Sequence, residues 1–314
     1  MKPVLEATNL NIGTRSQGKV RDVYRTDDRV ILVATDRHSV FDRVVAHVPG
    51  KGQVLNRLSA YWFAATNDIV ANHVLAVPDP NVTVARACTP IAIEAVMRGY
   101  LTGSTATSIW RHYKDGRRDF GTFQLPDGMR KNEKFSRPIF TPSTKDSAHD
   151  KTISTTEAIG LGLVNADLME NIESISRKLF ARGQEECIAK GIILADTKYE
   201  FGIDADGKLR LIDEIHTSDS SRYWEASSYE ERLEMNMEPD AFDKESLRLW
   251  YVEHCDPYAA AELPSPPQEL IDEISARYGI LFQRLTGETV EAVPNGLSIE
   301  DRIQKNLRRY IQRE

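Results

Sequence analysis

Short apolar runs separated by polar turns fill the first hundred residues, and this pattern is typical of β-strands. Two β-like stretches flank the polar turn at residues 26–29, and the apolar run at 30–34 predicts a buried strand. Apolar residues recur at helical spacing within 55–70, so we expect a helix there. A turn-rich stretch at 77–81 leads into further strand-like sequence.

Helical patterns prevail in the second half of the chain. Residues 165–191 form an amphipathic pattern that offers Asp167 as a cap and ends at Gly191. A strand is expected over 192–204, and a second long helix over 266–287. The predicted buried stripe of the first helix consists of Leu168, Ile172, Ile175, Leu179 and Ile188.

Residues 111–150 interrupt these periodic patterns. The stretch is polar and rich in Gly and Pro, so we expect long loops or short hairpins, which are often functional at this length. We place a soft boundary near Cys88, between a β-rich N-terminal lobe, 1–88, and a larger mixed lobe, 89–314. The predicted fold class is therefore α+β.

Composition narrows the classes of function. A chain of 314 residues is long enough for two linked cores. Its net charge of −7 argues against nucleic acid as a main partner, so a local cluster of cations must attract any anionic substrate. No apolar run approaches the roughly 20 residues that cross a bilayer. The start, MKPVLEATNL, lacks the pattern of a signal peptide, so we expect a cytoplasmic protein with no membrane partner.

Alternating charges mark the strand predicted over 192–204. Asp196, Lys198 and Glu200 fall at every second position, although Asp, Glu and Lys are depleted in strands. Side chains at this spacing share one face of a strand. The pattern predicts either a functional face or a solvent-exposed strand, because antiparallel sheets often have one wet face.

A hairpin count favours the functional face. The pair Asp206-Gly207 predicts a two-residue turn, and counting outward from it places Glu200 opposite Asp213. Two carboxylates in that position repel each other. A shared proton or a divalent cation would offset the repulsion, and Mg²⁺ is typically held by one or two carboxylates plus substrate phosphates. The hairpin also leads directly into the Asp- and Ser-rich segment HTSDSSR.

A glycine with two cations offers a first anion site. The segment SQGKVRDVY places Gly18, Lys19 and Arg21 at the start of a strand, where backbone amides can approach a phosphate. It matches neither the Walker A loop nor the glycine-rich loop of kinases and dinucleotide-binding folds. Taken alone, the segment is a weak signal.

Further polar side chains follow apolar strands. EAVMRGYLTGS offers Arg98 and Ser104 for a carboxylate or phosphate, and a structural turn with a surface Arg is the alternative. TDRHSVFD carries Asp36, Ser39 and Asp42 directly after an apolar strand, where ligand-binding loops often lie.

Other chemistries lack their motifs. The three cysteines are widely spaced and fit neither a disulfide framework nor a thiolate metal site. No Ser-His-Asp order, H-E-x-x-H or G-x-S-x-G is present, so hydrolysis through a nucleophile and zinc chemistry have no support. Acidic residues, separate basic anion sites and a Gly-containing loop favour nucleotide-dependent phosphoryl transfer.

The ordered segments resemble the phosphoribosylaminoimidazole-succinocarboxamide synthase (SAICAR synthetase) family over essentially the full length. They are GKVRDVY, TDRHSVFD, EAVMRGYLTGS, ADTKYEFGID and IDEIHTSDSSRYW, with AFDKESLRLW and YGILFQRLTG after them. The resemblance implies an ATP-dependent ligase of de novo purine synthesis. Its substrates would be 5-amino-1-(5-phosphoribosyl)imidazole-4-carboxylate (CAIR), L-aspartate and MgATP.

The resemblance also implies a fold and an assembly. It implies an antiparallel β-rich N-terminal lobe over a larger α/β lobe, with ATP in the cleft between them, related to kinase and ATP-grasp folds. The stretch 111–150 is longer than in compact members and resembles a larger monomeric type, so we expect a monomer.

Roles of individual residues follow from the same resemblance. The implied nucleotide ligands are Gly18, Lys19, Val20, Arg21, Lys145, Glu200 and Asp213, and the last two would also bind Mg²⁺. The implied substrate ligands are Asp36, Ser39, Asp42, Arg98, Ser104, Asp196, Asp219 and Arg222, with Arg222 on the CAIR phosphate. Some members carry a Lys in the strand before the adenine pocket, where the nearest cation here is Arg86.

The implied substrates suggest a mechanism. Transfer of the γ-phosphoryl group of ATP to the CAIR carboxylate would give an acyl phosphate, which the aspartate amine then attacks. Glu200, Asp213 and Lys198 are the expected catalytic residues, because phosphoryl transfer depends on positioning and charge neutralisation. A ligase or kinase for another small acid and a non-catalytic nucleotide-binding regulator remain as alternatives.

Overall fold

The first antiparallel sheet is built from the N-terminal strands. The computed structural model describes residues 3–105, 108–120, 123–145, 151–242, 244–260, 262–293 and 296–311. The strand order is β1-β2-β3-β7-β6. The strands are β1 (Thr14–Gln17), β2 (Arg21–Arg25), β3 (Arg29–Ala34), β6 (Val74–Asp79) and β7 (Val82–Arg86). β3 confirms the buried strand predicted at 30–34.

A second sheet carries the longest strands of the fold. β8 (Cys88–Tyr100) and β11 (Ile192–Asp204) pair antiparallel at its centre, and the order is β10-β8-β11-β12. The remaining strands of this sheet are β9 (Lys134–Phe140), β10 (Ser143–Thr144), β12 (Leu209–Ile212) and β13 (Ser221–Glu225). A separate hairpin, β4 (Arg37–Val40) and β5 (Arg43–His47), completes the β-structure.

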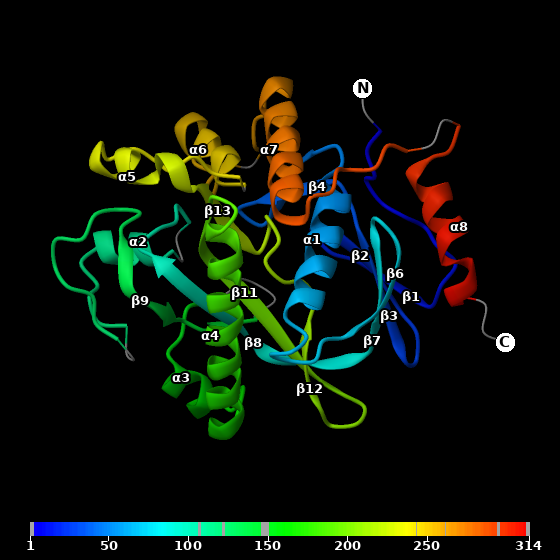
Figure 1. Cartoon of the computed structure of the whole chain (residues 1–314), viewed down its shortest axis with the longest axis horizontal. Helices are drawn as coiled ribbons and strands as arrows, with labels where there is room; N and C mark the ends of the chain where they lie inside the picture. Colours follow the sequence, from blue (N-terminus) through cyan, green and yellow to red (C-terminus); the bar gives the residue numbers. More distant parts are fainter. Residues whose placement is uncertain are drawn as a thin grey trace.

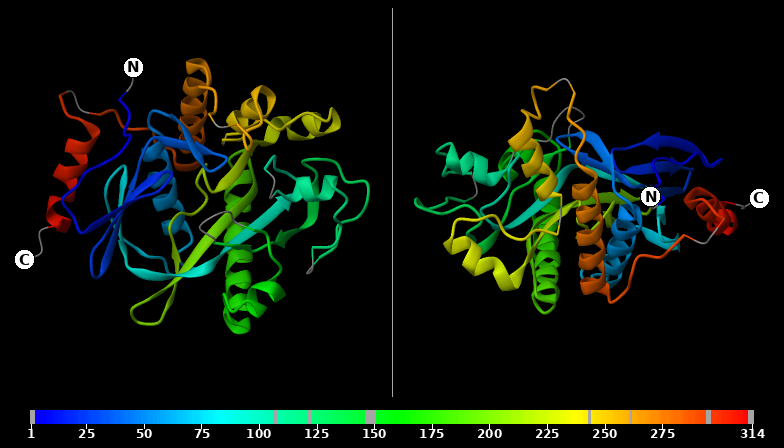
Figure 2. Two further views of the ribbon diagram at one scale, coloured as in Figure 1. Left: turned by 180° about the vertical axis from the view of Figure 1, so that it is seen from behind. Right: turned by 90° about the horizontal axis from the view of Figure 1, so that it is seen from above.

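Helices cover the second sheet and enclose the main core. Figures 1 and 2 show α4 (Ala166–Ile188) lying across one face of β8 and β11, and α1 (Lys51–Ala65) beside α7 (Gln268–Thr286). The shorter helices are α2 (Ile109–Lys114), α3 (Thr155–Gly160), α5 (Ala226–Glu234) and α6 (Glu245–His254). Apolar side chains of α1, α4, α7, β8 and β11 form one continuous buried cluster.

The helices predicted from periodicity exist, with shifted ends. α1 begins four residues before Leu55 because Gly50 adopts φ 78° at its start and the polar residues that follow are buried. The N-cap of α4 is Asn165, whose side chain accepts from the Leu168 amide at 2.8 Å, so the cap predicted at Asp167 is wrong. Ile188 is 57% exposed and does not belong to the buried stripe.

The stretch 111–150 holds more regular structure than its composition predicts. α2, β9 and β10 lie within or beside it, since apolar residues such as Phe135 and Ile139 pack into a cluster of their own. Residues 121–122 and 146–150 lie outside the described part of the chain.

The hairpin register predicted for Glu200 is wrong by one residue. Glu200 pairs with Ile212, and Asp213 lies just beyond β12 with φ 62°. The carboxylate of Asp204 accepts from the amides of Asp206 and Lys208 at 3.0 and 2.9 Å. These bonds close a three-residue loop that ends at the left-handed Gly207. The predicted loop had two residues, so the actual pairing is shifted by one residue.

The chain passes from the first sheet to the second between Arg86 and Cys88. We therefore retain the lobe division near Cys88 as a proposal. One late element crosses that division: α8 (Ile299–Ile311) packs Ile303 and Leu307 against the first sheet (Figures 1 and 2). None of the helices in the described ranges combines the length and apolarity that a bilayer crossing requires.

A buried ion pair fixes α8 to the first sheet. The Arg302 guanidinium donates to both carboxylate oxygens of Asp79 at 3.0 Å and to the Asn81 side chain at 2.6 Å. Asn306 also donates to Asp79, at 2.8 Å. The Asp79 side chain is fully buried, so its charge depends on these donors.

Arg302→Ala should lower the free energy of unfolding by about 3–5 kcal/mol, because it leaves a buried carboxylate without its bidentate partner. Urea unfolding measures the difference. Arg308→Ala, on the exposed face of the same helix, is the matched control and should change stability by no more than about 0.5 kcal/mol. Equal effects of the two variants would contradict the role of the ion pair.

Candidate functional site

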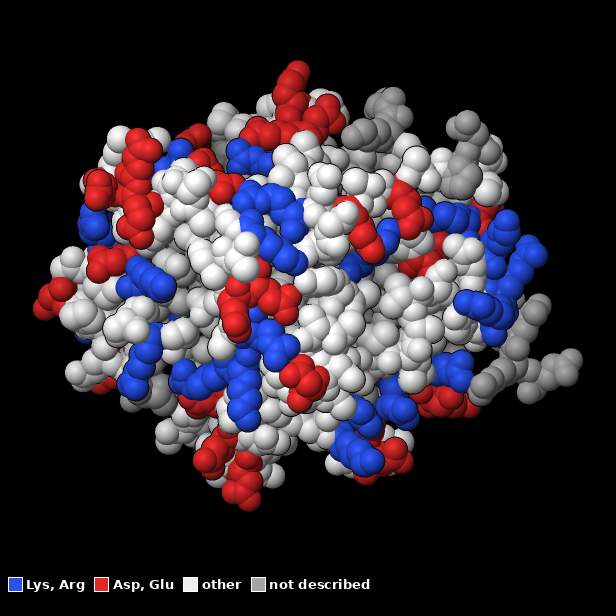
Figure 3. Space-filling model, viewed as in Figure 1, with Lys and Arg blue, Asp and Glu red and all other residues white. Residues whose placement is uncertain are grey.

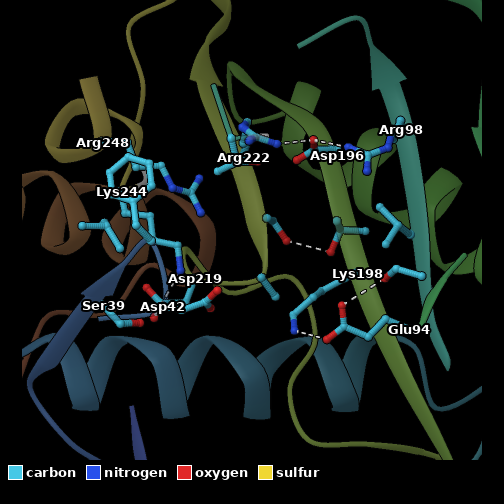
Figure 4. Close-up of a pocket in the computed structure, with 18 of the residues that line it drawn as sticks. Ser39, Asp42, Glu94, Arg98, Asp196, Lys198, Asp219, Arg222, Lys244 and Arg248 are labelled. Atoms are coloured by element: carbon cyan, nitrogen blue, oxygen red, sulfur yellow. Dashed lines mark hydrogen bonds and ion pairs between the residues drawn. The ribbon is translucent and has the colours of Figure 1, made fainter. Parts of the chain in front are cut away.

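A cavity of about 590 Å³ opens where the β4–β5 hairpin, the second sheet and α6 meet. Figure 4 shows charged side chains from all three pointing into it. The charged and hydroxyl residues that line it include Ser39, Asp42, Glu94, Arg98, Asp196, Lys198, Asp219, Arg222, Lys244 and Arg248. Figure 3 shows basic and acidic side chains interspersed over one face of the molecule. Because the net charge is −7, an anion must be attracted by the local charges of the cavity.

The pairing of β11 with β8 and β13 places the carboxylate of Asp196 between two guanidinium groups. Asp196 on β11 lies opposite Arg98 on β8 and opposite Arg222 on β13. Its Oδ2 atom is 2.5 Å from Nη1 of Arg222 and 3.7 Å from Nη1 of Arg98. Burial lowers the pKa of Arg98 to about 10, although Asp196 opposes the shift. The sequence predicted all three as substrate ligands, and the structure brings them together.

Glu245 extends this cluster. Its Oε2 atom lies 3.6 Å from Nε of Arg222 and 3.0 Å from Nη1 of Arg248. Burial alone would raise its pKa, but the two arginines lower it to about 2. Glu245 and Arg248 were not predicted as site residues, because nothing in the local sequence distinguishes them from other charges on a helix.

Lys198 lies between two carboxylates on one face of the sheet. Its Nζ atom is 2.5 Å from Oε1 of Glu94 and 3.8 Å from Oε1 of Glu200. Glu94 lies directly opposite Glu200 across β8 and β11, and Lys145 also pairs with Glu200. Burial works against the charge of Lys198, but the two carboxylates outweigh it and raise its pKa.

Glu94 is the main residue that sequence reasoning missed. The facing carboxylates are Glu94 and Glu200, whereas the predicted pair was Glu200 and Asp213. A lone acidic residue in the apolar run IAIEAVM was an available signal. Its position opposite Glu200 depends on the pairing of two strands that are about a hundred residues apart, and local sequence does not reveal that pairing.

A fully buried lysine supports Asp219. The Lys51 side chain is 0% exposed and donates from Nζ to Asp219 Oδ2 and to the Arg37 carbonyl, both at 2.8 Å. Tyr278 donates to Asp219 Oδ1 at 3.1 Å, and Nζ of Lys244 lies 4.0 Å from Oδ2. Burial would raise the pKa of Asp219, but Lys244 and Lys51 hold it far below its usual range.

The predicted phosphate loop joins the first sheet to the end of β12. Gly18 closes the loop by donating to the Arg21 carbonyl at 2.8 Å, and the Val20 carbonyl accepts from Thr35. Arg21 reaches Glu214 at 2.5 Å and Asp213 at 3.5 Å. Burial opposes its charge, yet Glu214 and Asp213 raise its pKa.

Lys19 points in another direction from the same loop. Its Nζ atom is 2.5 Å from Asp42 Oδ1, and both side chains are exposed. The pair therefore links the loop to the hairpin turn that lines the cavity.

Three predicted residues do not line this cavity. Asp36 is buried at the start of α1, where it accepts from the amides of Leu5 and Gly52 at 2.8 and 2.9 Å. Arg86 lies on β7, and its amide donates to the His73 carbonyl at 2.7 Å. Ser104 is half-buried in the segment after β8, and its side chain helps to lower the pKa of Glu245. Asp36, Arg86 and Ser104 do not line the cavity described above.

Comparison with known proteins gives consistent similarities. Residues 14–264 match the family model described as SAICAR synthetase. The chain is 48% identical to phosphoribosylaminoimidazole-succinocarboxamide synthase of Legionella pneumophila (strain Paris) over 98% of each chain. It is 45% identical to the chloroplastic synthase of Arabidopsis thaliana, over 96% of this chain and 74% of that one.

Solved structures agree with the sequence relatives. SAICAR synthase from Saccharomyces cerevisiae, complexed with SAICAR, superposes with a TM-score of 0.77 at 31% identity, over 91% of this chain and 99% of that chain. A SAICAR synthetase (Type-2) in complex with ADP superposes with a TM-score of 0.67 at 24% identity, over 88% of this chain and all of that chain.

Proposed function

The chain belongs to the SAICAR synthetase family, whose ATP-dependent ligation of L-aspartate to CAIR serves purine biosynthesis, and we propose that this chain performs it through an acyl phosphate. Its α+β fold is the fold of that family. The partners are small molecules, namely CAIR, L-aspartate and ATP. The position of Lys198 between Glu94 and Glu200, at one end of a cation-lined cavity, is the observation that carries the mechanism.

The CAIR phosphate is assigned to Arg98 and Arg222. Their guanidinium groups both lie beside Asp196, and arginine binds phosphate through paired hydrogen bonds. Lys198 lies two residues from Asp196 on the same face of β11, roughly 7 Å along the strand. A molecule bound by the arginines therefore extends toward Lys198 with its imidazole carboxylate.

Phosphoryl transfer needs neutralised charge at that carboxylate. A carboxylate oxygen of CAIR attacks the γ-phosphorus of ATP, and the bond from that phosphorus to ADP breaks. Lys198 keeps its proton because Glu94 and Glu200 raise its pKa, so its charge is present for the transferring group. The aspartate amine then attacks the carbonyl carbon, loses a proton and displaces phosphate.

The nucleotide is assigned to the phosphate loop. We propose that Gly18, Lys19 and Val20 cover its phosphates and that Arg21 and Lys145 contact them. Arg21 and Lys145 lie against Asp213 and Glu200, respectively, so cations and carboxylates alternate along this edge. Arg86 remains a proposed adenine-side contact, and Asp36, Ser39, Asp42, Ser104 and Asp219 remain proposed substrate contacts.

The carboxylates along this edge fit Mg²⁺. Within the described ranges, no three or more His, Cys, Asp or Glu side chains group to hold a metal by themselves. Mg²⁺ usually takes one or two carboxylates and completes its shell with water and substrate phosphates. Glu200 and Asp213, whose charges both act on Lys198, would hold the ion, which would neutralise phosphate charge when bound. A monomeric state and a cytoplasmic location complete the proposal.

The acyl phosphate has an isotopic signature. With CAIR labelled with ¹⁸O in its carboxylate, one label should move to inorganic phosphate in each turnover, and ADP release should require CAIR and L-aspartate together. Mass spectrometry of the phosphate and a coupled ADP assay measure both. Inorganic phosphate that carries no label, or label that appears in AMP, would rule out the route.

Glu200→Gln and Asp213→Asn should each reduce kcat by at least about 100-fold, since each removes charge where the proposed ion binds. Thermal unfolding measures any accompanying loss of stability, because both side chains are partly buried, with Glu200 11% and Asp213 29% exposed. Asp206→Asn, an exposed acid in the same hairpin, is the matched control. Near-normal kcat in either variant at ordinary Mg²⁺ concentration would remove that residue from the metal site.

Arg222→Ala should raise the KM for CAIR on the order of 10- to 100-fold, the worth of a charged hydrogen bond. Steady-state kinetics at saturating ATP and aspartate measure it. Arg210→Ala removes a guanidinium paired with Asp204 on the same sheet, outside the cavity lining, and controls for general loss of charge. An unchanged KM for CAIR would exclude Arg222 from the phosphate site.

A further inference from the structure

Lys244 lies in the cavity and has no part in the mechanism described above. It immediately precedes α6, and its side chain is 15% exposed. Figure 4 shows Lys244 and Asp219 across the cavity from Arg98, Lys198 and Glu94. The wall that carries Lys244 also includes Ser39.

Lys244 shares its carboxylate with a second lysine. Within the described part of the chain, Asp219 is the carboxylate with which Lys244 forms an ion pair, at 4.0 Å. Lys51 holds the same oxygen at 2.8 Å and is completely buried. Burial and the charge of Lys51 lower the pKa of the adjacent His38 well below its usual value, so that ring is neutral. Two cations therefore share one anion.

The other two charge clusters of the cavity differ from this one in their numbers of cations and carboxylates. Lys198 and Lys145 face Glu94 and Glu200, so that cluster carries equal numbers of cations and carboxylates. The cluster that contains Arg98, Arg222 and Arg248 holds two carboxylates and one excess positive charge, which suits the CAIR phosphate. The excess charge at Lys244 is a separate one.

We propose that Lys244 is the cation that binds a side-chain or α-carboxylate of L-aspartate. The inference rests on the proposed function, because it takes the CAIR phosphate at Arg98 and Arg222 and the CAIR carboxylate at Lys198 as already placed. With the ATP phosphates assigned to the phosphate loop, the anionic groups of the substrates that remain are the two carboxylates of the amino acid. Lys244 faces the reacting carboxylate from the opposite wall, where the attacking amine must enter.

The surroundings of Lys244 give the subsite a pH dependence. Burial lowers its pKa to about 8, with Arg248 and Lys51 acting in the same direction and Asp219 and Glu214 opposing the shift. The cation is therefore present below about pH 8 and is lost as the pH rises through that value. A bound carboxylate favours the charged form, so loss of the proton weakens aspartate binding.

Kinetics of Lys244→Met and Lys244→Arg test the proposal. Lys244→Met should raise the KM for L-aspartate on the order of 10- to 100-fold, with the KM values for CAIR and ATP nearly unchanged. In the native enzyme the KM for aspartate should rise above about pH 8, because Lys244 loses its proton there. Lys244→Arg keeps its charge over this range, so the ratio of its KM to the native KM should fall as the pH rises.

Lys178→Met, an exposed lysine on α4, is the matched control and should leave all three KM values unchanged. An unchanged KM for aspartate in Lys244→Met, or a rise in the KM for CAIR instead, would overturn the proposal. If Lys244→Met does not fold, the pH profile of Lys244→Arg decides, and a profile parallel to that of the native enzyme would overturn it.

Calorimetry separates this inference from the proposed function. L-aspartate is titrated into native enzyme and Lys244→Arg, each holding CAIR and a non-hydrolysable ATP analogue, at pH 7 and pH 9. Selective loss of native binding at pH 9 supports the subsite even if turnover is absent, and equal loss in both proteins contradicts it. Absence of aspartate-dependent ADP release in the native enzyme would contradict the proposed function alone.

Discussion

The antiparallel pairing of β8 with β11 decides where the charges of the site lie. Each strand has thirteen residues, and their register sets Arg98 opposite Asp196 and Glu94 opposite Glu200. Because side chains alternate along a strand, a shift of one residue would move one strand's charges into the core. The core side chains on the other face, packed under α4, therefore hold the polar face in register.

Local sequence predicted the parts of the fold that depend on local periodicity. The helices α4 and α7 and the buried strand β3 follow from apolar spacing, and the alternation of Asp196 and Lys198 correctly placed them on one face. The hairpin register was missed because the Asp204 carboxylate selects an odd-numbered loop, and a turn dipeptide alone does not reveal that choice.

Residues whose surroundings are distant in sequence could not be predicted. Lys51 looks like an ordinary exposed residue at a helix start, but Asp219, 168 positions later, holds it in the interior. Glu94 faces Glu200 only because β8 pairs with β11, which begins at Ile192. In both cases burial of a charge is tolerable only because an opposite charge arrives from elsewhere, and local pattern carries no trace of the partner.

The attachment of α8 to the first sheet has a consequence for the order of synthesis. Ile303 and Leu307 cover Tyr24, Ile31 and Val84, which leave the ribosome long before them. The carboxylate of Asp79 likewise has no ion-pair partner on α8 until Arg302 is synthesised. The N-terminal lobe therefore completes its core after the larger lobe that follows it in the chain, and a nascent chain that stops before α8 carries an uncovered apolar sheet.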